Sequence, residues 1–154
     1  MTLIHAVLLC LHALAAAFWV GGMAVITWAV RPAAVQTLDP PLRLAFLAAA
    51  LWRFFNGVLV AIAVLLLSGI AMIVLAGGMG RVHWSVHAML ALGTVMMLIF
   101  AQLRWGAGVR LQRAVAGRDW ATAAANLGLI RQRVVINLVL GLAVFVLAIV
   151  ARAL

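Results

Sequence analysis

Apolar residues run through most of the chain in four long blocks, separated by three segments that carry arginine, proline, glycine or aspartate. A helix that crosses a bilayer needs about 20 mainly apolar residues, and each block is long enough. The blocks lack the period-two alternation of membrane β-strands. The pattern therefore predicts an all-α integral membrane protein, an up-down-up-down four-helix bundle. The expected membrane spans are Leu3 to Val30, Leu44 to Ala76, Trp84 to Leu103 and Val134 to Ala151.

The first segment between the blocks contains residues that end and begin helices. Arg31-Pro32 should end the first helix, because proline disfavours helical geometry in the residue before it. Asp39 followed by Pro40 is typical of an N-cap and the first position of a helix, so the second helix should begin there or soon after.

The third and fourth helices are expected to continue past the membrane surface. Gly117 and Asp119 are typical of a helix end and a new N-cap, which predicts an αα-hairpin around them. We therefore expect residues 1–154 to form one transmembrane domain. Its four helices should span about 3–30, 44–76, 84–116 and 119–152.

Composition agrees with a membrane protein. Hydrophobic residues make up 69% of the chain and charged residues 8%, which is too few to cover a water-soluble surface, so the main partner is the lipid bilayer. The cations are all arginines, and they are not interleaved with aromatic residues as on a nucleic-acid surface, so we expect no nucleic-acid partner. Cys10 is the single cysteine and has no internal disulfide partner.

The arginines predict the orientation, because loops rich in positive charge stay in the cytosol. Arg81 and Arg152 lie on one side of the membrane, and nine arginines lie on the other. Both termini should therefore be outside a bacterial inner membrane, in the periplasm of a Gram-negative cell. No basic residue precedes the first block, which disfavours a cleaved signal peptide. The nine are Arg31, Arg43, Arg53, Arg104, Arg110, Arg113, Arg118, Arg131 and Arg133.

Four histidines are the most distinctive polar residues of the spans. His5 and His12 are seven residues apart, which places them on nearly the same helix face with His12 about 10 Å deeper. His83 and His87 are four apart and also share a face. The first and third helices run in the same direction, so their outer ends are level. We expect an outer pair, His5 with His83, and an inner pair, His12 with His87.

An ionisable residue inside a membrane span is a candidate functional site, because its burial in hydrocarbon is costly. Both acids of the chain, Asp39 and Asp119, are expected on the cytosolic side, so these histidines have no carboxylate nearby. A backbone carbonyl or Ser68 can also satisfy a neutral imidazole, and then the histidine is only structural.

Two ligands suit neutral imidazoles without carboxylates. Haem iron takes axial histidines from facing helices of a bundle. Copper also accepts imidazole, and the thioethers of Met72 and Met79 would favour the cuprous ion, although methionine commonly just fills gaps in a core.

One stretch of the first helix resembles known families. His12 is followed seven residues later by Trp19-Val20-Gly21-Gly22, and Arg31-Pro32 follows, as in the membrane domain of the copper resistance protein D (CopD) family. This resemblance implies copper uptake or handling by the outward histidines, often beside a periplasmic copper-binding partner.

A more distant similarity is to the HemJ-type protoporphyrinogen oxidases, and it implies haem b with His12 as an axial ligand. The chain has no lysine, whereas that family is expected to carry one on the third helix. The similarity therefore does not extend to protoporphyrinogen oxidation.

The sequence thus predicts a membrane redox or electron-transfer protein that binds haem b through His12 and His87, with an adjacent copper site at His5 and His83. The alternative is copper transport or binding by these four histidines without haem, and a third reading is an interaction subunit with structural histidines. An electron-transfer partner, a homo-oligomer and an enzymatic activity all stay open.

Overall fold

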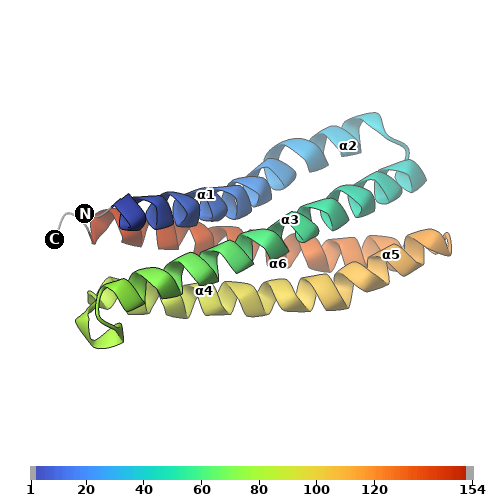
Figure 1. Ribbon diagram of the computed structural model, residues 1–154. Helices are drawn as coiled ribbons and strands as arrows, with labels where there is room; N and C mark the ends of the chain where they lie inside the picture. Colours follow the sequence, from blue (N-terminus) through green and yellow to red (C-terminus); the bar gives the residue numbers. More distant parts are fainter. Residues whose placement is uncertain (1–2, 152–154) are drawn as a thin grey trace.

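The computed structural model describes residues 3–151 and shows four long helical rods in a bundle (Figure 1). Each rod is long and apolar enough to cross a membrane, so the predicted all-α membrane fold is confirmed. The first rod consists of α1 (Leu3–Val25), the π-helical turn η1 (Ile26–Val30) and α2 (Arg31–Thr37), and the second is α3 (Pro40–Leu75). The third consists of α4 (Trp84–Gln102), the π-helical turn η3 (Leu103–Ala107) and α5 (Gly108–Ala116), and the fourth is α6 (Trp120–Val150).

The first rod does not end at Arg31-Pro32, and that prediction is wrong. The helix continues through Pro32 to Thr37. Proline in a helix removes one N–H and pushes its ring against the carbonyl four residues earlier. The π-helical turn η1 lies directly before it, and the Arg31 N–H donates to the Ile26 carbonyl five residues back. This wider turn relieves the conflict and keeps the helix intact.

The helix starts predicted at Asp39 and Asp119 agree with the structure, whereas the predicted end of the fourth helix at residue 152 lies outside the described residues. Asp39 is the N-cap residue of α3 and Pro40 its first helical residue, although the Asp39 side chain makes no capping hydrogen bond. The hairpin between α5 and α6 is also present, and the Asp119 carboxylate accepts a hydrogen bond from the Thr122 N–H at 3.0 Å. Hydrogen bonds from the Thr122 side chain and backbone lower the pKa of Asp119 below its ordinary value.

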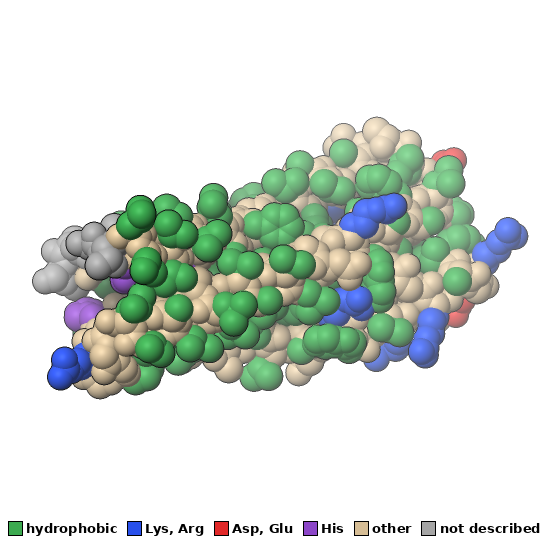
Figure 2. All heavy atoms as spheres, in the orientation of Figure 1, with side chains coloured by type: hydrophobic (Ala, Val, Ile, Leu, Met, Phe, Trp, Pro, Cys, Tyr) green, Lys and Arg blue, Asp and Glu red, His purple; other side chains and the backbone are tan. Residues whose placement is uncertain are grey.

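The two ends of the bundle differ in composition (Figure 2). The α2–α3 and α5–α6 connections lie at one end together with most of the arginines, and we call it the arginine end (Figures 1 and 2). The helical starts of α1 and α4 lie at the opposite end, which carries the histidines and which we call the histidine end. There, α3 and α4 are joined through Gly77 and Gly78, whose positive φ values of 90° and 98° favour glycine.

The packing order decides which side chains can meet. Within residues 3–151, α1 packs mainly along α3 and less extensively along α6, whereas α4 packs along α6. The first and third rods therefore lie across the bundle from each other. They meet in the core through Trp19 of α1 and Phe100 of α4, whose ring centroids are 6.0 Å apart. Phe55 of α3 packs edge-on against Phe100 at 5.7 Å.

Candidate metal site at the histidine end

His12 lies half-buried on α1, against α3. Its Nδ1 is 2.9 Å from the Oγ of Ser68, which is buried. Gly69 lies next to the same ring, and a Cβ at this position would be 3.3 Å from His12 Cε1. A small residue at 69 therefore lets the imidazole lie close to the α3 backbone.

The hydrogen-bond network assigns the tautomer of His12. The Ser68 hydroxyl donates to the Val64 carbonyl at 2.6 Å, so its oxygen acts as the acceptor toward His12. The same hydroxyl lies 3.3 Å from the Leu65 carbonyl, a second acceptor for its proton. Nδ1 therefore carries the proton, and Nε2 keeps its lone pair. Metal-binding histidines commonly have this arrangement, because the hydrogen bond at one nitrogen orients the other toward the ion.

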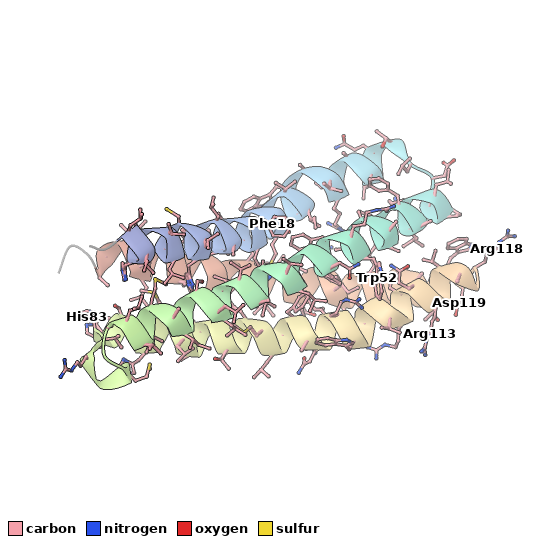
Figure 3. The ribbon with its side chains drawn as sticks, viewed as in Figure 1. Phe18, Trp52, His83, Arg113, Arg118 and Asp119 are labelled. Atoms are coloured by element: carbon pink, nitrogen blue, oxygen red, sulfur yellow. The ribbon has the colours of Figure 1, made fainter. Side chains whose placement is uncertain are left out.

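His83 has the opposite arrangement at the exposed start of α4 (Figure 3). It is the N-cap residue, and its Nδ1 accepts from the Ser85 N–H at 3.4 Å and lies 2.9 Å from the Ser85 hydroxyl. The proton of the neutral ring is therefore on Nε2. His83 can bind a metal through Nδ1 only if it stops capping the helix, and through Nε2 only if that nitrogen loses its proton. Histidine is not among the usual N-cap residues, which is why the sequence did not reveal this role.

The other two predicted site residues lie on the same helices. His5 is half-buried near the start of α1, and His87 is exposed on α4, one turn beyond His83. Within the described part of the chain, no group of three or more histidine, cysteine, aspartate or glutamate side chains comes together as a metal site. Cys10 is exposed on α1.

The predicted pairing of His12 with His87 needs α1 and α4 to present these residues to each other. The two helices lie across the bundle, His12 is hydrogen-bonded to α3, and His87 is exposed. The structure thus brings His12 together with Ser68, and the pairing with His87 stays a prediction.

Four helical rods, each long and apolar enough to cross a membrane, define a small all-helical membrane protein with a hydrogen-bonded imidazole on α1. The chain belongs to the copper resistance protein D (CopD) family, because the family model matches residues 48–151, which are more than half of the chain. No curated protein and no solved structure gives a significant match. The predicted CopD resemblance is confirmed, and membership links the chain to copper resistance.

The matched region starts after His5 and His12. It contains Ser68, His83 and His87. The role of His12 therefore rests on its geometry, and the match independently supplies the link to copper.

Proposed function

We propose that this protein binds copper within the outer half of the bundle, with His12 as the principal ligand. The observation that carries the proposal is the hydrogen bond from His12 Nδ1 to Ser68, which leaves the Nε2 lone pair available. Copper is the cargo, and membership of the CopD family supports its choice over other metals that accept imidazole.

Further ligands are available along the seam between α1 and α3. Met72 follows Ser68 by one turn on α3, and His5 precedes His12 by two turns on α1. The two helices are antiparallel neighbours, so helix geometry places Met72 between the levels of His12 and His5. A thioether beside imidazoles selects cuprous over cupric ion.

The same seam is closed on the arginine side of His12. Phe18 of α1 lies against Gly57 of α3, and Phe54 of α3 lies against Gly22 of α1. These apolar contacts offer no ligand that would carry copper onward. We therefore propose a holding or exchange site that opens to the outer face, where a periplasmic copper-binding partner would load or unload it, rather than a continuous transport path.

The proposed orientation places the histidine end outside a bacterial inner membrane. The arginine-rich connections then lie in the cytosol, as expected from the distribution of positive charge.

Haem b is the second candidate, because an axial histidine needs the same free Nε2. The described residues fit it less well than they fit copper. The Trp19–Phe100 contact fills the space between α1 and α4 about 10 Å from the level of His12, and His87 is exposed. This geometry reverses the order of preference from the sequence alone. Haem, when bound, would supply one-electron chemistry at these histidines.

The test is a cuprous-ion titration of the purified protein against a competing chelator, combined with a visible spectrum. We expect His12→Ala to weaken cuprous binding by about tenfold or more, as loss of one of a few ligands should. His83→Asn is the matched control, because asparagine preserves the N-cap, and it should leave the affinity unchanged.

Two results would contradict the copper assignment. The first is unchanged copper affinity in His12→Ala. The second is a Soret band in the wild-type protein that disappears in both His12→Ala and His87→Ala, which would establish haem with two histidine ligands.

A further inference from the structure

A hollow of about 330 Å³ lies at the arginine end, between α2, α3 and α6. Arg31 of α2, Arg43 of α3 and Arg131 of α6 line it, together with apolar side chains that include Leu44 and Leu47. It thus combines three cations with an apolar wall. Nothing in the copper proposal uses this region, so the inference drawn from it is independent of that function.

A second, smaller hollow of about 50 Å³ adjoins the first. The two share Arg31 and Arg131 as lining residues, and the second continues past Leu51, Ile130 and Val134. Apart from the two arginines and Thr27, its lining is apolar. The pair of hollows therefore has a cationic mouth and an apolar extension that leads away from the end of the bundle.

Within residues 3–151, the three guanidinium groups have no anionic partner. Arg31 is half-buried and close enough to Arg43 and Arg131 to be repelled by both. Among residues 3–151, none of the three forms an ion pair or a side-chain hydrogen bond, and the hollow has no acidic lining residue. Arginine keeps its charge in proteins, so an anion from outside would relieve this repulsion directly, beyond the screening that water gives.

The π-helical turn explains how Arg31 reaches the hollow. In an uninterrupted α-helix, Arg31 would lie about 80° around the axis from the buried Met23. A π-turn takes up one extra residue, which rotates the following segment back and brings Arg31 to within about 20° of that face. The turn that accommodates Pro32 thereby also directs an arginine inward.

We propose that this hollow is a binding site for an anionic phospholipid. Guanidinium groups match phosphate oxygens through paired hydrogen bonds, so the three arginines would hold the headgroup phosphate. The apolar extension beside Leu51 and Val134 would take the first part of an acyl chain. A phospholipid meets both requirements, and basic pockets between membrane helices are known to bind anionic lipid headgroups.

The experiment measures the thermal unfolding midpoint and lipid retention of the purified protein in a neutral detergent. The probes are phosphatidylglycerol, phosphatidylcholine and inorganic phosphate, each titrated separately. We expect phosphatidylglycerol to raise the midpoint, and the other two to have little effect at equal concentration.

Variants locate the site. Arg31→Gln and Arg131→Gln should each weaken phosphatidylglycerol binding about tenfold, as loss of one charge-assisted hydrogen-bond donor predicts. Arg113→Gln is the matched control, because Arg113 lies exposed at the same end and does not line the hollow (Figure 3). It removes the same charge and should leave binding unchanged.

A further variant tests the hollow itself if an arginine variant fails to fold. Ala124 is exposed and lines the hollow, so Ala124→Trp fills the space while all three arginines remain. It should also weaken lipid binding. Equal losses in Arg113→Gln and Arg31→Gln would overturn the proposal, as would unchanged binding in Ala124→Trp. Stabilisation by inorganic phosphate alone would assign the site to a soluble anion instead.

Discussion

The two ends of the bundle satisfy their polar side chains in opposite ways. At the histidine end, each imidazole described in detail has its own partner: His12 bonds Ser68 and His83 bonds Ser85. At the arginine end, Arg31, Arg43 and Arg131 line one hollow and have no side-chain partner among the described residues. A neutral imidazole needs one hydrogen bond to be tolerated inside a span, whereas a guanidinium stays charged and needs a counter-charge or water.

The backbone also differs between the two ends, because the irregular helical turns lie near the arginine end. The second and fourth rods are single α-helices of 36 and 31 residues, but the first and third contain the π-turns η1 and η3, near the arginine end. In η3, Arg104 lies 3.7 Å above the Trp52 ring and donates to the Asn56 side chain at 3.1 Å. Arg31, directly after η1, has no such contacts. The proposed lipid site would give Arg31 an external partner in place of these internal ones.

The largest expected effect comes from introducing an arginine at the histidine end. His12→Arg puts a permanent charge inside a span, where Ser68 supplies only a hydroxyl, and should cost about 3 kcal/mol in stability. Expression yield and the monodisperse fraction after detergent extraction measure it, with His12→Gln as the neutral control. Normal yield of His12→Arg would show that the seam at this level is open to water.

A smaller effect is expected when only the orientation of His12 is disturbed. Ser68→Ala removes the acceptor for Nδ1–H and should weaken cuprous binding by about 10-fold to 100-fold, as loss of a partner to a metal-binding histidine generally does. Ser68→Thr keeps the hydroxyl and should restore binding. If Ser68→Ala lowers the unfolding midpoint but not copper affinity, the hydrogen bond is purely structural.

At the arginine end, Pro32→Ala tests whether the π-turn positions Arg31. Without the proline, η1 can return to α-helical geometry, which would rotate Arg31 away from the hollow. Phosphatidylglycerol affinity should then fall several-fold, to an extent no greater than in Arg31→Gln. If η1 is lost but the affinity for phosphatidylglycerol is unchanged, the π-turn does not position the lipid site.

The smallest effect concerns Asp119, whose pKa is lowered by hydrogen bonds from Thr122. A lowered folded-state pKa adds stability above the unfolded value of about 3.9, and this stability is lost as the pH falls through the folded-state pKa. The unfolding midpoint should therefore drop slightly more below pH 4 in the wild type than in Asp119→Asn. Parallel pH profiles for the two proteins would show that Asp119 does not stabilise the helix as a cap.

Much of the candidate site was visible in the sequence, but its assembly was not. The sequence indicated that His12 is deep in a span and named Ser68 as one possible partner. It also suggested that the first and third helices face each other. That inference used only the equal depth of their outer ends, which does not determine which helices are neighbours. The sequence predicted that Arg31, Arg43 and Arg131 lie on one side of the membrane. It did not indicate that three separate helices bring them to one hollow.

The sequence by itself determined that the chain is a four-helix membrane protein, that helices begin after Asp39 and Asp119, and that its polar chemistry lies in histidine and arginine. These properties depend on hydropathy and on local capping signals, which act within one helix. Only the tertiary structure decided that α1 lies along α3, that His12 donates to Ser68, and that the π-turn before Pro32 directs Arg31 inward. Those outcomes depend on helix rotation and neighbour choice, and packing between helices sets both.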